Sequence, residues 1–188
     1  MLEREIKLPF ATPADARLAI LAAGAAPLRC RRLQEDALFD TDDESLRRRG
    51  CALRVRMDSG RSLLTFKGPI QPGPMKIREE HETVVSDGEV LIHLLQSLGL
   101  HVWFRYQKFR EEFAAEDATI ALDETPIGTY VEIEGGERAI TTFTQALGRS
   151  PDDFILDSYR GLFLARRTQF GLEGANMLFA DEWSLRSS

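Results

Sequence analysis

The sequence predicts an α+β fold that is mainly β, with about eight strands that can close into a barrel and helices packed on its outside. Three observations support this fold class: segments in which charged and apolar residues alternate, turn signals between these segments, and stretches with helical periodicity. In the first segment, Glu3, Glu5 and Lys7 alternate with apolar residues, and side chains two apart in a strand share one face. A sheet of about eight strands can close around a small ligand.

The expected strands are separated by short polar stretches or by stretches rich in glycine and proline. Asp58-Ser59-Gly60 predicts a hairpin turn, and 68–74 is a loop with three prolines and two glycines. Turns at 115–117 and 125–127 make the last three strands a meander. In chain order, the expected strands are 2–10, 28–41, 51–58, 62–68, 76–85, 101–115, 117–124 and 128–135.

Helix signals lie between these strands. Thr12 is placed to cap a helix that begins at Pro13 and ends near Gly24. A second helix has apolar residues at helical spacing and ends before Gly99. The expected helices are 13–24, 87–98 and 137–148, followed by a short helical or extended piece at 159–167.

Length and composition indicate one domain, expected to cover 1–168, with a tail at 169–188 whose order stays open. Of the 188 residues, 43% are hydrophobic and 29% are charged, as in soluble proteins. No apolar run approaches the roughly 20 residues that span a bilayer, and a net charge of −6 disfavours a nonspecific nucleic-acid binder. Cys30 and Cys51 lack CxxC spacing and indicate reduced thiols of a cytoplasmic protein.

Charged side chains of both signs share one face of nearly every expected strand. Arg54 and Arg56, for example, alternate with Leu53 and Val55. Cross-strand ion pairing on a solvated face explains any single row of charged residues along a strand. To explain all of the rows, such pairing must hold independently on each strand. A sheet curled so that these faces line a cavity would instead need a highly charged ligand.

The residue types in these rows indicate the ligand's chemistry. Paired carboxylates such as Glu132 and Glu134 repel each other unless a hard cation such as Mg²⁺ or Mn²⁺ lies between them. Arginine offers bidentate contacts to phosphate oxygens. Acidic groups, basic groups and metal in one enclosed site suit phosphoryl or nucleotidyl transfer.

Read in order, the rows resemble the CYTH family, also called triphosphate tunnel metalloenzymes, over about residues 1–165. The opening Glu3-x-Glu5-x-Lys7 is similar to the family's signature. The other matching motifs are Phe39-Asp40-Thr41, Leu53-Arg54-Val55-Arg56, Leu64-Thr65-Phe66-Lys67-Gly68, Arg78-x-Glu80-x-Glu82, Lys108-x-Arg110, Ile120-x-Leu122-Asp123, Gly128 to Glu132-x-Glu134, and Ser158-Tyr159.

The resemblance implies an eight-stranded antiparallel closed β-barrel, a tunnel in which basic residues bind a triphosphate and acidic residues bind divalent metal. The implied phosphate contacts are Lys7, Arg54, Arg56, Lys67, Arg78, Lys108 and Arg110. The implied metal ligands are Glu3, Glu5, Asp123, Glu132 and Glu134, with Glu80 and Glu82 as further candidates. Lys7 and Glu5 are the catalytic candidates, and some of the acids are expected to orient arginines instead.

The chain departs from the family pattern at one place. Many relatives have a tyrosine where this chain has Leu38 or Phe39, and in some triphosphatases of the family that tyrosine pairs with the N-terminal lysine. No such lysine–tyrosine pair is therefore expected. Trp103, Phe104 and Tyr106 are expected to pack on the barrel exterior.

The expected function is metal-dependent hydrolysis of a triphosphate, which is inorganic triphosphate, a nucleoside triphosphate or thiamine triphosphate, with Mg²⁺ or Mn²⁺ as the cofactor. The alternative is a class IV adenylate cyclase that converts ATP to cyclic AMP and pyrophosphate. A second alternative is a polyphosphate-binding module without turnover. The only expected partner is the small-molecule substrate, without nucleic acid or membrane, and the protein is expected to be a monomer or homodimer.

Overall fold

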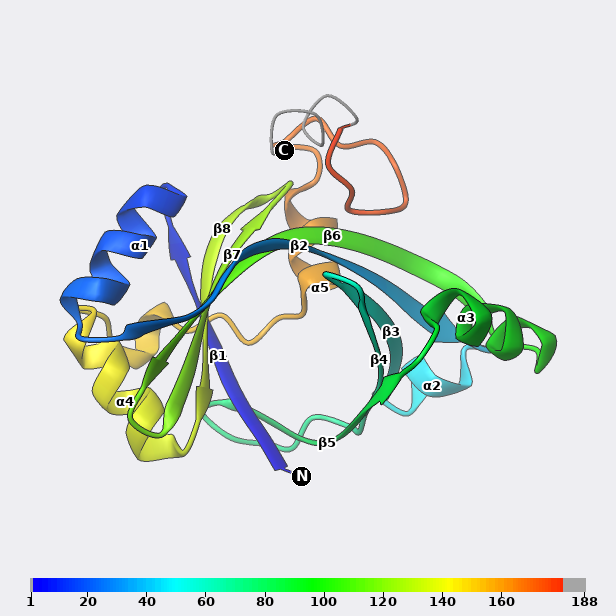
Figure 1. The fold of residues 1–188 in the computed structure, drawn as a ribbon, viewed down its shortest axis with the longest axis horizontal. Coiled ribbons are helices and arrows are strands. Elements are labelled where there is room, and N and C mark those ends of the chain that lie inside the picture. The colour runs from blue at the N-terminus through cyan, green and yellow to red at the C-terminus, as the bar shows by residue number, and fades with distance from the viewer. Residues whose placement is uncertain (1, 181–188) are drawn as a thin grey trace.

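A computed structural model describes residues 2–180, in which eight antiparallel strands close into a barrel (Figure 1). Around the wall the strand order is β1-β5-β4-β3-β2-β6-β7-β8. The strands are β1 Leu2–Phe10, β2 Ala26–Asp40, β3 Ala52–Asp58, β4 Arg61–Lys67, β5 Lys76–Val85, β6 His101–Ala115, β7 Ala118–Thr125 and β8 Gly128–Gly135. The predicted fold class is confirmed, and each expected strand lies within two residues of its predicted bounds.

Three of the described helices begin where the sequence supplies a capping side chain. The Thr12 hydroxyl accepts from the backbone N–H of Asp15 at 3.1 Å, and Asp87 and Ser158 cap two later helices in the same way. The short helix α2 and the 3₁₀ turn at Pro151–Asp153 were not expected. The α-helices are α1 Pro13–Ala22, α2 Ser45–Arg48, α3 Gly88–Ser97, α4 Glu137–Ala146 and α5 Tyr159–Arg166.

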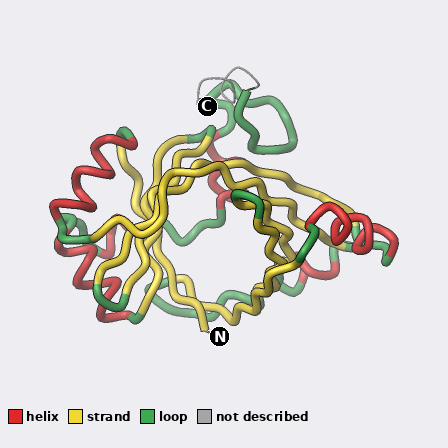
Figure 2. The backbone as a smooth tube through the Cα atoms, in the orientation of Figure 1, coloured by secondary structure: helices red, strands yellow, loops and turns green. Residues whose placement is uncertain are grey.

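Three helices lie against the outside of the barrel (Figure 2), and the side chains buried beneath them are apolar. Helices α1 and α4 pack over β1, β7 and β8, where Ile20 and Ile140 bury against Ile6 and Ile133. Helix α3 packs over β3, β4 and β6, with Ile92 fully inside that contact. Because the strands beneath these helices turn their apolar sides toward them, the charged sides of these strands face the barrel interior.

The register of β1 places its charged residues opposite charged residues of both neighbouring strands. Glu3 lies opposite Arg78 of β5, while Glu5 and Lys7 lie opposite Glu134 and Glu132 of β8. Directly opposed side chains on one face lie close enough to interact. The pairing therefore brings the acidic and basic rows of distant segments into one space.

The segment after α4 completes the barrel wall where strands lack a full-length partner. Strand β6 pairs with β7 only from Phe109 onward, and its earlier half is bridged by Met177, which exchanges backbone hydrogen bonds with Arg105 and Gln107. Ile155 bridges Lys7 of β1 in the same manner. The expected tail thus contacts the barrel as far as it is described, and 181–188 lie outside the described residues.

Within the described part, no helix has the length and apolar character needed to cross a lipid bilayer.

Candidate functional site

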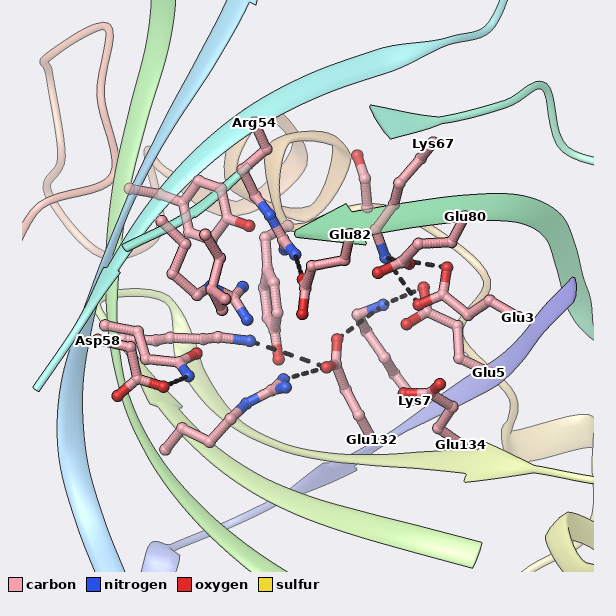
Figure 3. Close-up of a pocket in the computed structure, with 18 of the residues that line it drawn as sticks. Glu3, Glu5, Lys7, Arg54, Asp58, Lys67, Glu80, Glu82, Glu132 and Glu134 are labelled. Atoms are coloured by element: carbon pink, nitrogen blue, oxygen red, sulfur yellow. Dashed lines mark hydrogen bonds and ion pairs between the residues drawn. The ribbon is translucent and has the colours of Figure 1, made fainter. Parts of the chain in front are cut away.

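The barrel encloses a cavity of about 290 Å³ whose lining is almost wholly charged (Figure 3). Every predicted site residue except Asp123 lines it. The charged lining residues are nine basic ones (Lys7, Arg29, Arg54, Arg56, Lys67, Lys76, Arg78, Lys108 and Arg110) and eight acidic ones (Glu3, Glu5, Asp58, Glu80, Glu82, Glu112, Glu132 and Glu134). The lining therefore carries almost no net formal charge of its own.

Arg54 and Arg56 of β3 project into this cavity and are held by one buried carboxylate. The Arg56 guanidinium donates to Asp36 of β2 at 2.9 and 3.2 Å, and Arg54 lies 3.4 Å from the same carboxylate. Against the effect of burial, the two guanidinium groups lower the pKa of Asp36. Asp36, which was not among the predicted site residues, therefore stays ionised and fixes both arginines in place.

Lys7 is buried between two carboxylates. Its Nζ lies 3.4 Å from Glu5 and 3.1 Å from Glu132. Burial alone would lower the pKa of Lys7, but these two carboxylates raise it above its ordinary value, and the pKa of Glu5 is lowered in turn. Lys7 is thus a permanent cation at neutral pH, suited to stabilising negative charge rather than to accepting a proton.

Asp123 lies behind the lining and collects three donor side chains. Its carboxylate accepts from Lys108 Nζ at 2.8 Å and from Arg110 at 2.7 and 2.6 Å. It also accepts from the Tyr159 hydroxyl at 2.6 Å. With its oxygens engaged in this way, Asp123 is better suited to orienting cations than to ligating metal.

Tyr159 enters the site from α5 rather than from a strand. Its ring lies under two ammonium groups, with its centroid 5.3 Å from Lys7 Nζ and 4.8 Å from Lys108 Nζ. A tyrosine therefore does stand beside the N-terminal lysine, although Leu38 and Phe39 supply none. The only sequence signal for it was the Ser158-Tyr159 motif, which predicted no role.

The carboxylates of β1, β5 and β8 crowd together at one end of the cavity. Lys67 Nζ contacts Glu3 at 2.7 Å and Glu80 at 2.5 Å. Glu134 has no ion pair with a basic side chain among residues 2–180, and partial desolvation together with the charge of Glu3 raises its pKa to about 7. This cluster of Glu3, Glu80 and Glu134, with Glu5 beside it, is called the acidic end below.

The chemistry of the acidic end fits a hard divalent cation. Carboxylate oxygens are the ligands that Mg²⁺ and Mn²⁺ prefer, and a cation would counter both the desolvation and the repulsion from Glu3 that raise the pKa of Glu134. In the described chain, no three acidic, His or Cys side chains already stand in a common liganding arrangement, since Lys67 and Lys76 engage Glu3 and Glu5. The residues that would hold the ion are therefore Glu3, Glu5, Glu80 and Glu134.

Besides Asp123, two further predicted metal ligands lie outside the acidic end. Glu132 contacts Lys7, Lys108 and Arg110, and these cations hold its pKa well below its usual range despite burial. Glu82 lies 3.6 Å from the Arg54 guanidinium and accepts from the Thr65 hydroxyl at 2.9 Å. Both acids line the cavity, but their contacts suit the orientation of basic side chains.

Several lining residues were missed from the sequence, and one expectation was wrong. Tyr106 lines the cavity instead of the exterior, because it lies on the same face of β6 as Lys108 and Arg110. Lys76 likewise shares the inward face of β5 with Arg78 and is buried against Glu5. The spacing of two residues was the available signal in both cases. Arg29, Gln34, Asp58, Leu63, Glu112 and Ser158 complete the lining.

Comparison with known proteins agrees with this architecture. The CYTH domain family model matches residues 1–155. A Methanocaldococcus jannaschii protein named "Putative adenylate cyclase MJ0240" is 30% identical over 146 residues, which covers 70% of this chain and 83% of that protein.

Solved structures show the same fold. The PH1012 protein of Pyrococcus horikoshii superposes with a TM-score of 0.73 at 25% identity, covering 85% of this chain and 98% of that one. HpAC1 from Hippeastrum, an adenylyl cyclase by name whose structure is described as revealing a dominant triphosphatase activity, superposes with a TM-score of 0.65 at 19% identity, covering 87% and 95%. On the family match, the sequence relative and the tunnel geometry together, the chain belongs to the CYTH domain family.

Proposed function

We propose that this protein hydrolyses a triphosphate inside the barrel, with a divalent metal ion bound at the acidic end. The observation that carries the proposal is the enclosed cavity, in which basic side chains from β1, β3, β4, β5 and β6 and carboxylates from β1, β5 and β8 face one space. A folded protein desolvates this many charges at a cost. A ligand that is itself a chain of charged groups offsets that cost.

Charge balance supports a metal ion entering with the substrate. The nine basic and eight acidic lining residues nearly cancel, so a triphosphate would leave the cavity strongly negative. A divalent cation at the acidic end compensates for both the crowded carboxylates and the phosphates. When bound, it would supply Lewis-acid stabilisation of charge on the phosphate oxygens.

The basic side chains divide into those that bind and those that act where bonds change. Arg54, Arg56, Lys108 and Arg110 are held by carboxylates behind or beside them, and their remaining donors are available to phosphate oxygens. Lys7 stabilises the charge that develops as water attacks phosphorus and a phosphate group leaves. Glu5, proposed from the sequence as catalytic, keeps Lys7 charged and oriented.

A second candidate is cyclisation of ATP to cyclic AMP and pyrophosphate. It is favoured by the relative that is 30% identical and carries the name of an adenylate cyclase. The two reactions differ in the nucleophile, which is water in hydrolysis and the ribose 3′-oxygen in cyclisation. The same basic cavity can serve either one.

Product analysis separates the candidates. The purified protein is incubated with inorganic triphosphate or ATP and Mg²⁺ or Mn²⁺, and the products are followed by ³¹P NMR and ion-exchange chromatography. Phosphate release supports hydrolysis, whereas cyclic AMP with pyrophosphate supports the cyclase. Tight binding of both compounds without any product would overturn both proposals and indicate a binding module.

A further inference from the structure

Lys76 of β5 is a cation at the acidic end that the sequence motifs did not single out. It is 3% exposed and lines the cavity. Its ammonium group contacts the Glu5 carboxylate, and this contact is its only ion pair among residues 2–180. Lys7 and Lys67, by comparison, each contact two carboxylates. Lys76 therefore has the fewest carboxylate partners of the three lysines at the acidic end.

Strand register places Lys76 in a row with two carboxylates. Glu5 of β1 lies directly opposite Lys76 of β5 on one side and directly opposite Glu134 of β8 on the other. Directly opposed residues of neighbouring strands share a face and lie close together. Glu5 thus stands between an ammonium group and a second carboxylate. A metal ion that bridges Glu5 and Glu134 would therefore bind next to Lys76.

The two carboxylate oxygens of Glu5 differ in their surroundings. Lys7, at 3.4 Å, and Lys76 both contact the same oxygen, Oε1. The other oxygen, Oε2, has no hydrogen bond or ion pair with any side chain or backbone group of the described chain. Oε2 is thus the Glu5 oxygen that a metal ion could use. Two positive charges at Oε1 oppose the approach of a divalent cation to it.

A bound triphosphate would change this balance of charge. Its oxygens are charged acceptors, and a lysine ammonium group has three donors on a flexible stem, so it can turn from one acceptor to another. Lys76 has one carboxylate partner and lines the cavity, so its ammonium group can turn toward the phosphate chain. Glu5 then keeps one ammonium partner instead of two, and its affinity for a divalent cation rises.

We propose that Lys76 is exchanged between Glu5 and the phosphate chain, so that a divalent cation binds strongly at Glu5 only when the triphosphate is present. The inference rests on the proposed function and adds the coupling between its two ligands. Because linked binding is reciprocal, the metal ion also strengthens the binding of triphosphate.

The test measures the binding of each ligand alone to Lys76→Met, which removes the charge and keeps an unbranched side chain. Mn²⁺ binding without triphosphate is followed by the electron paramagnetic resonance signal of the free ion. Triphosphate binding without metal is followed by isothermal titration calorimetry in EDTA. We expect Mn²⁺ to bind Lys76→Met about tenfold more tightly, because one repelling charge is gone. Triphosphate should bind about tenfold more weakly, because one charge-assisted hydrogen bond is lost.

Two further variants control for general effects, and circular dichroism checks the folding of each variant. Lys76→Gln keeps a hydrogen-bond donor for Glu5 without the charge, so it should shift both affinities as Lys76→Met does, and it replaces Lys76→Met if that variant does not fold. Arg29→Met removes a lining cation that lies 3.5 Å from Asp58, across the cavity from Glu5 (Figure 3). Its Mn²⁺ affinity should stay within about twofold of the wild type, because repulsion falls with distance.

Tighter Mn²⁺ binding together with weaker triphosphate binding would support the exchange, since mere damage to the site would weaken both. Weaker binding of both ligands, or an unchanged Mn²⁺ affinity, overturns the inference and leaves the proposed function in place. An equal gain in Mn²⁺ affinity in Arg29→Met also overturns it, because the net charge of the cavity would then be the cause. If the wild type binds neither ligand, the proposed function fails together with the inference.

Discussion

Replacing Tyr159 by Phe tests whether α5 helps to build the phosphate site. The change removes one hydroxyl that donates to the buried Asp123 at 2.6 Å and leaves the ring beneath Lys7 and Lys108. A hydrogen bond to a charged group contributes about 1.5–3 kcal/mol. Asp123 keeps its bonds from Lys108 and Arg110, so we expect the lower value, a loss of about 1.5 kcal/mol in the free energy of unfolding.

The loss corresponds to a drop in Tm of about 3–6 °C for a chain of this size, and urea denaturation gives the free energy directly. Because Asp123 orients Lys108 and Arg110, KM for triphosphate is expected to rise about threefold to tenfold while kcat changes less. The matched control is Tyr130→Phe, since the Tyr130 hydroxyl bonds to Ile127 and Arg166 in the same aromatic cluster without reaching Asp123. If Tyr159→Phe has the same KM as the wild type and is no less stable than Tyr130→Phe, the reasoning is refuted.

Three further predictions concern charge. Burial and the nearby Arg110 lower the pKa of Lys108 to about 8, so the Lys108 cation is lost as pH rises through that value. We expect kcat/KM to fall above about pH 8 in the wild type and much less in Lys108→Arg. Identical pH profiles would contradict a role for the Lys108 cation in binding phosphate. Arg54→Ala should weaken triphosphate binding about tenfold to a hundredfold, measured against the exterior variant Arg17→Ala. Glu134, whose pKa is raised to about 7, loses its negative charge as pH falls below that value. The metal concentration that gives half-maximal activity in the wild type should therefore rise as pH falls below 7, toward the value for Glu134→Gln. The control is Glu79→Gln. A half-maximal metal concentration that does not change with pH would argue against ligation by Glu134.

Much of the barrel was predictable because its wall follows a simple period. Alternation of charged and apolar residues identified most of the strands, and together with the family resemblance it assigned their charged sides to the interior. The same period places Lys76 with Arg78 and Tyr106 with Lys108. These residues were missed through incomplete use of the pattern rather than through lack of a signal.

Other features depend on register, which local sequence does not encode. Asp36 holds Arg54 and Arg56 because β2 pairs with β3 at one particular offset, and a shift of two residues would give Asp36 other neighbours. The role of Asp123 as an orienting group likewise depends on three donors that come from β6 and α5. Tyr159 follows the barrel in the chain, where no strand period applies, so only tertiary packing places it in the site.

The position of β1 has a consequence for how the protein matures. This first strand is paired on one side with β5 and on the other with β8, more than 120 residues later, as in the pair Glu5 and Glu134. Contacts so far apart in sequence form slowly, because a long loop must close first. During synthesis, Glu3, Glu5 and Lys7 leave the ribosome early and then wait for β8 to emerge. The cavity that these residues line can therefore close only after β8 has been made, long after the first strand.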